Sequence, residues 1–253
     1  GSDLEGGYHL ADLLRRLREK NAVDWIRVLY AYPTGWNEDL IAQFAAPKTP
    51  GQTWVLPYVD LPLQHSCDRI LKRMNRQTGC AETKELLSRL RESIPDLVLR
   101  STFIVGFPGE TEEEFRDLLA FVRHQRFQRC GVFAYSAEKG TPAAAFEDQI
   151  DPETKQRRRE ELYKVTAEIS RRYADSRVGT RADVLVDAPA IDKEGEIAEG
   201  MFLGRSWAEA PDIDPVIYLT TDAQPGEIVS AEIVLTSDLD LIAADTDLSS
   251  DAP

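Results

Sequence analysis

The chain has 253 residues, of which 42 % are hydrophobic, and a formal net charge of −14. This length suffices to bury a core in one large and one small domain. It contains no run of about 18 apolar residues and no signal-peptide pattern, so neither a membrane span nor secretion is indicated, and we expect a cytoplasmic protein. The first residues, which include no initiator Met, lead us to expect a fragment of a longer protein.

Cysteine and histidine spacing indicates no metal centre. Cys67, Cys80 and Cys130 match no zinc or iron–sulfur loop, and their odd number argues against a disulfide framework. We therefore expect reduced thiols and no metal ligands in this chain.

Residues 10–135 alternate between helical and strand patterns, and the connections are long enough for parallel crossovers. The predicted fold class is therefore α/β, either a slice of a barrel or a doubly wound sheet. A cap at Asn37 and a capping box of Thr111 with Glu114 mark two helix starts. Helices are expected over 10–19, 37–46, 66–75, 81–94 and 111–125, and strands over 25–33, 58–63, 97–107 and 131–135.

The ends of these strands are rich in Gly, Pro and hydrogen-bonding groups. They read "AYPTG" (31–35), "PLQH" (62–65), "GFPGE" (106–110) and "YSAEKGTPA" (135–143). Functional residues gather at the carboxyl ends of parallel strands in both candidate architectures. We therefore predict one shared site at this edge.

A different pattern begins after residue 150. Asp151 and Pro152 start a long predicted helix that ends near 177, and five period-two segments between 182 and 245 predict a small all-β barrel. Residues 176–253 contain 17 Asp or Glu and four Lys or Arg, which give a charge of −13. The expected domains are 1–150, a linking helix over 151–177, a barrel over 178–247 and a loose tail over 248–253.

Five motifs occur in order along nearly the whole chain: "YAYPTG", "DLPLQHSCDRILKRMNR", "STFIVGFPGETEEEF", "GVFAYSAEKGTPAA" and "GRSWAEAPDIDPVIYL". With them the chain resembles the methylthiotransferases of the radical S-adenosylmethionine (SAM) superfamily. It is most similar to the RimO type, which modifies a ribosomal protein, and the tRNA-modifying MiaB type is the nearest relative of that type. The resemblance implies the last four βα units of a partial TIM-like radical SAM barrel, followed by a TRAM-like (OB-like) barrel.

The same resemblance implies a transferase that uses S-adenosylmethionine and two 4Fe–4S clusters. Such an enzyme adds a methylthio group to the β-carbon of an aspartate in a small-subunit ribosomal protein. The cluster loop of the family, Cys-x-x-x-Cys-x-x-Cys, is absent here, as are the first two barrel strands and the N-terminal cluster domain. We therefore expect the fragment alone to be inactive, with no catalytic residue of its own.

By resemblance, "FIVGFPGE" packs on the adenine side of the cofactor, which makes Ile104, Gly106, Gly109 and Glu110 candidate contacts. Ile104 and Gly106 offer an apolar backbone surface that a purine can approach closely. The competing interpretation is a well-made turn, with Glu110 as a first-turn carboxylate favoured by the helix dipole.

Six further residues are candidate cofactor contacts because they end strands or face the predicted barrel interior. Arg100 would pair with the carboxylate of the cofactor, although a structural ion pair is an equal alternative. For the others the alternatives are loop packing and core packing. The six are Gln64, His65, Arg100, Thr102, Phe133 and Tyr135.

The acidic barrel is expected to repel phosphate and to attract a basic protein, which makes a ribosomal protein a better substrate than tRNA. Trp207, Asp212 and Asp214 are its candidate substrate contacts, Trp207 as an aromatic anchor unless it is buried in the core. The alternative to substrate binding is that the acidic surface only keeps the protein soluble. An electron donor is a further expected partner, and no membrane contact is expected. The competing functions are a tRNA methylthiotransferase and a non-catalytic binding module.

Overall fold

The computed structural model describes residues 9–191 and 195–246 and divides the chain into two compact units, Gly1–Ala167 and Glu168–Pro253. The long helix α6 (Pro152–Arg177) contributes to both units. No helix among the described residues has the length and apolar character needed to cross a membrane. The expected tail over 248–253 lies outside the described residues.

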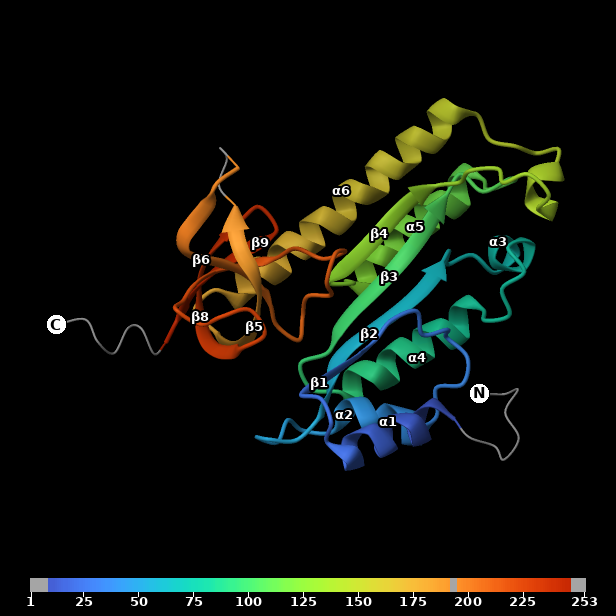
Figure 1. The fold of residues 1–253 in the computed structure, drawn as a ribbon. Helices are drawn as coiled ribbons and strands as arrows, with labels where there is room; N and C mark the ends of the chain where they lie inside the picture. Colours follow the sequence, from blue (N-terminus) through green and yellow to red (C-terminus); the bar gives the residue numbers. More distant parts are fainter. Residues whose placement is uncertain (1–8, 192–194, 247–253) are drawn as a thin grey trace. The chain divides into compact units, whose positions relative to one another are not determined.

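The first unit contains a parallel sheet of four strands in the order β1-β2-β3-β4, as the predicted strand–helix alternation requires (Figure 1). The helices between the strands supply the crossovers. The elements are α1 (Leu10–Lys20), β1 (Trp25–Val28), α2 (Glu38–Ala45), β2 (Trp54–Gln64), α3 (Asp68–Arg73), α4 (Cys80–Ser93), β3 (Val98–Val105), α5 (Glu112–Gln125), β4 (Arg129–Ala134) and a 3-10 turn η1 (Pro142–Ala145).

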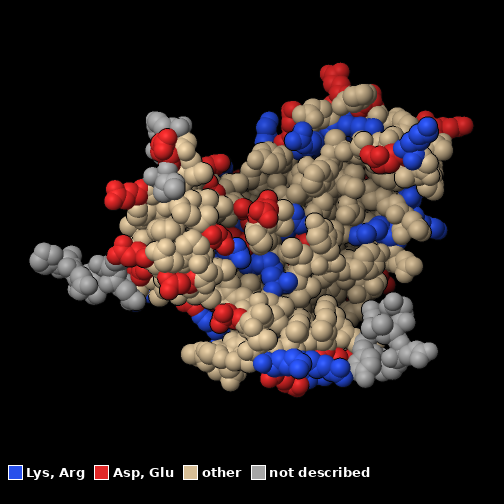
Figure 2. Space-filling view, in the orientation of Figure 1, with Lys and Arg blue, Asp and Glu red and all other residues tan. Residues whose placement is uncertain are grey.

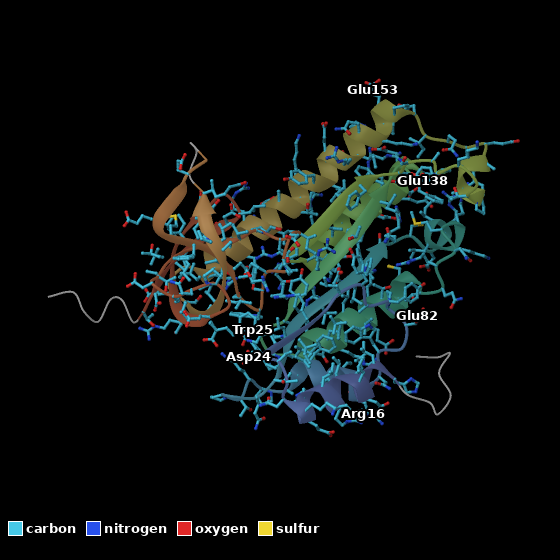
Figure 3. All side chains as sticks on the ribbon, in the orientation of Figure 1. Arg16, Asp24, Trp25, Glu82, Glu138 and Glu153 are labelled. Atoms are coloured by element: carbon cyan, nitrogen blue, oxygen red, sulfur yellow. The ribbon has the colours of Figure 1, made fainter. Side chains whose placement is uncertain are left out.

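The predicted helix starts are confirmed by their hydrogen bonds. The Asn37 side chain accepts from the Leu40 N–H at 2.9 Å, and Thr111 and Glu114 form a reciprocal capping box at the start of α5. The Asp151 side chain accepts from the Thr154 N–H at 2.8 Å at the start of α6. Labelled polar residues such as Arg16 on α1 and Glu153 on α6 lie on the outer sides of their helices (Figure 3).

Two strand limits, the end of β1 and the start of β2, differ most from the prediction. β2 begins at Trp54, four residues before the expected start, because Pro57 is accommodated where the β1–β2 register shifts between Ile26 and Val28. β1 ends at Val28 because Tyr30 adopts a left-handed conformation (φ 58°), and its N–H bonds to the buried Asp60 carboxylate at 3.0 Å.

Alternate residues of β3 are fully buried, so one face of the sheet forms the core with the helices. Phe103 on this face packs edge-on against Phe127 at 5.5 Å between ring centroids and against Phe121 of α5 at 6.3 Å. Arg100, Thr102 and Ile104 lie on the opposite, less buried face. The side chains predicted to face the barrel interior are therefore on one face of β3, as period two requires.

The second unit is a closed barrel in the order β5-β6-β7-β9-β8, which confirms the predicted small all-β fold. Pairs are antiparallel except for β7 with β9. Its core is built from alternate residues of the strands, among them Val184, Leu219 and Ile233. The strands are β5 (Arg181–Ile191), β6 (Ile197–Arg205), β7 (Ile217–Thr220), β8 (Ile228–Ser237) and β9 (Asp240–Asp245).

Candidate functional site

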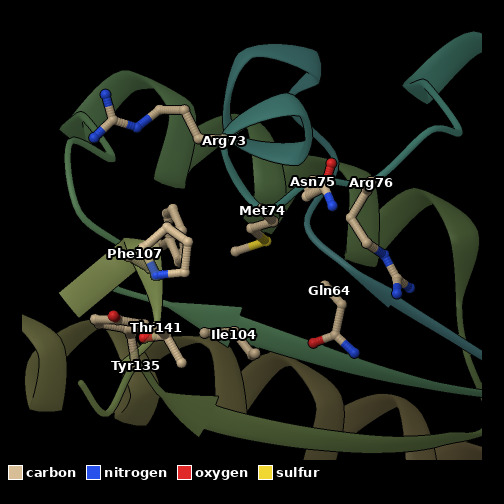
Figure 4. Close-up of a pocket in the computed structure, with 11 residues that line it drawn as sticks. Gln64, Arg73, Met74, Asn75, Arg76, Ile104, Phe107, Tyr135 and Thr141 are labelled. Atoms are coloured by element: carbon tan, nitrogen blue, oxygen red, sulfur yellow. The ribbon is translucent and has the colours of Figure 1, made fainter. Parts of the chain in front are cut away.

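A hollow of about 460 Å³ lies at the carboxyl ends of β2, β3 and β4 (Figure 4). Three predicted site residues line it: Gln64 at the end of β2, Ile104 on β3 and Tyr135 just after β4. The remaining walls come from the residues around the end of α3, from Phe107 and from the turn η1. These additional lining residues are Arg73, Met74, Asn75, Arg76, Phe107, Thr141, Pro142 and Ala143.

Three buried polar atoms of the lining residues have no hydrogen-bond partner within the described part of the chain. They are the side-chain oxygen Oε1 of Gln64, the Nε of Arg73 and the hydroxyl of Tyr135. A buried polar group without a partner is costly, so such atoms indicate a ligand or a water that would satisfy them. Figure 4 shows the Gln64 amide between β2 and the α3 segment, beside the apolar Ile104 and Met74. The hollow therefore combines apolar side chains, among them Met74, Ile104 and Phe107, with several polar groups, which suits a flat heteroaromatic ligand such as a purine.

The position of Gln64 follows from local backbone geometry. The register of β2 against β3 shifts between Leu61 and Gln64, and Gln64 takes a left-handed conformation with φ 70°. A left-handed non-glycine residue is uncommon and costs free energy, so the surrounding structure must hold it.

The next residue, His65, does not line the hollow. Its side chain is buried, its Nδ1 accepts from the Cys67 N–H at 3.0 Å, and burial lowers its pKa to about 4. His65 is therefore neutral in the loop after β2, and its buried Nε2 has no hydrogen-bond partner among the described residues.

Both glycines of the GFPG turn are required by the local structure. Gly106 (φ 70°) lies against Lys155 of α6, and Gly109 (φ 78°) lies against the Asp148 carboxylate; a Cβ at either position would overlap those side chains. Neither glycine lines the hollow. The close approaches that the turn permits are thus to other parts of the same unit.

Glu110 is buried and does not line the hollow. Its Oε2 accepts from the N–H of Gly106 and, at 3.2 Å, from that of Phe107. Arg158 of α6 lies 3.4 Å from Oε1 and donates to the Glu110 backbone oxygen at 3.0 Å. Burial raises the pKa of Glu110 to about 7, against the opposing effects of Arg158 and the two N–H donors. In the structure Glu110 holds the turn that carries Phe107, and it is not a first-turn carboxylate, because Thr111 caps α5 and α5 begins at Glu112.

Phe107 and Tyr135 form one wall of the hollow. Their rings meet edge to face with centroids 5.0 Å apart, and the Lys155 ammonium lies 5.0 Å from the centroid of the Tyr135 ring. Aromatic pairs in this arrangement add stability beyond the area that they bury. The wall is thus held by Glu110 from one side and by α6 from the other.

Arg100 forms the structural ion pair that was its alternative interpretation. Its Nη1 lies 2.9 Å from Oδ1 of Asp60, whose side chain is fully buried. Arg100 does not line the hollow, and neither do Thr102 and Phe133. The Phe133 side chain is 57 % exposed and stands opposite Ile104 in the β3–β4 register.

The barrel residues predicted to bind substrate have different environments. Trp207 is half-buried, packs against the barrel core and has the Arg177 guanidinium 4.9 Å above its ring, so it is not the exposed anchor that the sequence suggested. The Asp214 carboxylate accepts from the Ala210 N–H at 2.9 Å, whereas Asp212 is exposed in a left-handed turn. Exposed Asp and Glu side chains gather on this unit (Figure 2).

The described residues contain no group of three His, Cys, Asp or Glu side chains that could hold a metal ion. The three thiols are all reduced and partly buried. An iron cluster therefore finds no ligand set within residues 9–191 and 195–246.

Comparison with protein families gives two matches. Residues 4–122 match the radical SAM superfamily and residues 178–244 match the TRAM domain. The fold agrees with a solved coproporphyrinogen III oxidase, HemN of Escherichia coli, described as a radical SAM enzyme: 20 % identity, TM-score 0.50, 63 % of this chain and 36 % of that chain. Residues 4–122 are thus similar to radical SAM proteins and residues 178–244 to TRAM domains, and the radical SAM superfamily implies S-adenosylmethionine and a 4Fe–4S cluster.

Curated relatives show a closer similarity over most of the chain. The chain is 45 % identical to the ribosomal protein uS12 methylthiotransferase RimO of Geobacter sulfurreducens and 40 % identical to that of Caldanaerobacter subterraneus subsp. tengcongensis. Both matches cover 96 % of this chain, and 52 % and 53 % of the respective relatives. The chain is therefore similar to RimO-type methylthiotransferases over nearly its whole length, and it spans about half the length of the relatives it matches.

Proposed function

We propose that the complete protein is a radical SAM methylthiotransferase that adds a methylthio group to the β-carbon of an aspartate in a small-subunit ribosomal protein. The observation that carries this proposal is the identity of 40–45 % over 96 % of the chain to enzymes named for that activity. It extends through both the strand-end motifs and the barrel. A tRNA substrate and a purely binding role have no comparable support.

We propose that the hollow receives the adenosyl part of S-adenosylmethionine. Gln64 and Tyr135 would pair with polar atoms of the nucleoside, and Ile104 and Phe107 would contact its ring. When bound, S-adenosylmethionine and its cluster supply the radical and the methyl group. The residues of this chain bind and orient the nucleoside and exclude water from one side of it.

The proposed cluster ligands lie in the part of the complete protein that this chain does not contain. The chain spans about half of its relatives, and its described residues offer no three-ligand group. We propose two clusters, an external electron donor and a cytoplasmic location for the complete enzyme. Methylthiolation of the purified ribosomal protein, detected by mass spectrometry with the complete enzyme, is the direct test; no mass increase on the aspartate refutes the activity.

Replacement of Tyr135 by phenylalanine tests the nucleoside hollow. We expect about tenfold weaker binding of S-adenosylhomocysteine, because a hydrogen bond to the Tyr135 hydroxyl is lost. Thermal stability should be unchanged or slightly higher, since a buried hydroxyl without a partner is removed. Calorimetric titration of the chain and of Tyr163→Phe, an exposed control on α6, decides the matter. Equal affinity of the Tyr135→Phe variant and the wild type excludes the hydroxyl from the site.

The second unit is proposed to recruit the basic ribosomal protein by charge. Glu199, Asp212 and Asp222 are exposed on the barrel, and their side chains have no hydrogen bond or ion pair in the described structure. Opposite charges steer association and favour a complementary partner, with an effect that salt screens.

Neutralising these three barrel carboxylates to their amides should weaken binding of the ribosomal protein and flatten its salt dependence. The matched control neutralises three exposed carboxylates of the first unit, Glu19, Glu85 and Glu138. Surface plasmon resonance at several salt concentrations measures both sets. If the two triple variants lose affinity equally, the barrel has no special part in recruiting the substrate.

A further inference from the structure

A second hollow, of about 770 Å³, lies between α4 and the end of α5. Four cationic or titratable side chains line it: Arg91 from α4, and Arg123, His124 and Arg126 from the end of α5. Within the described structure no carboxylate lines it. We call this feature the arginine hollow. Residues 1–175 contain 27 acidic and 26 basic residues, so a pocket that carries a single sign of charge is not a general property of this unit.

The cations of the arginine hollow are not neutralised by the protein. Arg123, His124 and Arg126 are exposed, and their side chains make no hydrogen bond or ion pair with other described residues. Arg91 donates to Oε1 of Gln125 at 2.8 Å and to its backbone oxygen. Burial lowers the pKa of Arg91, and the charge of Arg126 lowers it further.

Helix capping does not account for this convergence. Cations in the last turn of a helix are favoured by its dipole, which explains Arg123 and His124 in isolation. The backbone oxygen of Gln125 already accepts a hydrogen bond from the Arg91 guanidinium. The backbone oxygen of Val122 accepts one from the Arg126 N–H at 3.0 Å. The exposed guanidiniums of Arg123 and Arg126 therefore remain available, and Arg91 reaches the same hollow from a different helix.

The arginine hollow is separate from the nucleoside hollow. α5 begins after the carboxyl end of β3, beside the GFPG turn, and ends just before β4 begins. Since the strands are parallel, the start of β4 lies at the opposite edge of the sheet from the carboxyl ends. A ligand in the arginine hollow would thus leave the nucleoside hollow free.

We propose that the arginine hollow binds the phosphate backbone of RNA. Guanidinium groups present a planar fork that matches phosphate oxygens, and several of them in one concavity can hold adjacent phosphates. Neutralising phosphates supplies much of the affinity of proteins for nucleic acid. The choice of RNA rests on the proposed function, because a protein of the small ribosomal subunit is met together with ribosomal RNA.

The test uses the whole chain and a fluorescent single-stranded RNA of about 20 nucleotides, with binding followed by anisotropy at several salt concentrations. The double variant Arg123→Gln/Arg126→Asn should bind about tenfold more weakly. Its salt slope should fall by about 1.4, at about 0.7 per phosphate contact of a single strand. Asn is chosen at Arg126 because this residue is left-handed (φ 51°), a conformation that Asn tolerates.

The control Arg116→Gln/Arg159→Gln removes two exposed charges outside the hollow and should keep wild-type affinity and slope. Equal losses in both double variants would show that general charge is responsible and would overturn the proposal. Competition by polyglutamate as effective as competition by unlabelled RNA would also overturn it, in favour of an acidic protein partner. The RNA assay needs no methylthio transfer, so it can succeed or fail independently of the proposed activity, which is measured with the complete enzyme.

Discussion

Replacement of Arg158 by methionine is expected to lower the free energy of unfolding of the first unit by about 3–5 kcal/mol at pH 8. The variant leaves the buried carboxylate of Glu110 without its cation, and breaking one side of a buried ion pair has this cost. The two side chains are 5 % and 0 % exposed, so solvent does not take the place of the missing guanidinium. At pH 8 Glu110 is ionised in the wild type, where its pKa is about 7, and the loss of Arg158 removes a charge that lowers this pKa.

The control for this prediction is Arg159→Met, a change of the same type at the next residue of α6, where the side chain is exposed. Urea denaturation, followed by circular dichroism and by hydrogen exchange of the β3 and α5 amides, measures both variants. Arg159→Met should change the stability by less than about 0.5 kcal/mol. If both variants unfold at the same urea concentration, Arg158 does not hold the turn.

The same ion pair should influence ligand binding through Phe107. Because Glu110 holds the Phe107 N–H, and Phe107 packs on Tyr135, a loosened turn disorganises one wall of the nucleoside hollow. We expect Arg158→Met to bind S-adenosylhomocysteine more weakly at temperatures where it is still folded, whereas Arg159→Met should not. Arg158 is thus a positioning residue, which acts through Glu110.

Glu110 also predicts a pH dependence of stability. Burial raises its pKa from 4.5 to about 7 in the folded chain, so between these values the folded chain holds a proton that the unfolded chain has lost. This contribution to stability is fully present below about pH 4.5 and is lost as the pH rises through about 7. Glu110→Gln should therefore show a flatter stability profile between pH 5 and 7.5, which urea titrations at a series of pH values will measure.

The fold was largely predictable because its signals are local. Caps at Asn37, Thr111 and Asp151 mark helix starts, and period-two burial marks the barrel strands. The limits of β1 and β2 were missed for reasons that the local pattern does not contain. Tyr30 turns left-handed because the Asp60 carboxylate, 30 residues away, takes its N–H, and Pro57 lies inside a strand whose register shifts around it.

The candidate site was predictable in its place but not in all of its members. Gln64, Ile104 and Tyr135 lie at strand ends or beside them, and parallel topology brings these positions together. Whether the GFPGE residues line the hollow or pack inside the unit depends on their contacts with α6, which is distant in the sequence. Arg158 lies 48 residues after Glu110 in the sequence, and Lys155 is similarly far from Gly106. No local sequence pattern therefore predicts these contacts.

The arginine hollow also depends on contacts between residues that are distant in the sequence, so it was not predicted. Arg91 and Arg126 are 35 positions apart, and nothing in their neighbouring residues indicates that they share a cavity. Only the packing of α4 beside α5 reveals the convergence. The numbers of acidic and basic residues nearly balance over the first 175 residues, so the charge composition does not indicate this cluster of cations.

The buried ion pair of the barrel should be the most sensitive feature of the second unit. Arg177 pairs with Glu209, and their side chains are 5 % and 2 % exposed. Ser206 bridges them: its hydroxyl donates to Glu209 Oε2 at 2.6 Å and accepts from Arg177 Nη2 at 3.0 Å. The Arg177 guanidinium also lies over the Trp207 ring, so one side chain organises the acidic loop after β6.

Arg177→Met is accordingly expected to destabilise the barrel by about 3–5 kcal/mol, because Glu209 would stay buried without a cation and with one fewer hydrogen-bond donor nearby. Asp187→Asn is the matched control: it breaks the pair of Asp187 with Arg205, whose side chains are 34 % and 27 % exposed, and should cost at most about 1 kcal/mol. Hydrogen exchange of the β5 and β8 amides reads the barrel separately from the first unit. Similar exchange rates in the two variants would mean that the Arg177–Glu209 pair contributes no more than a surface ion pair, and that the loop holding Trp207 is fixed by apolar packing against the barrel core instead.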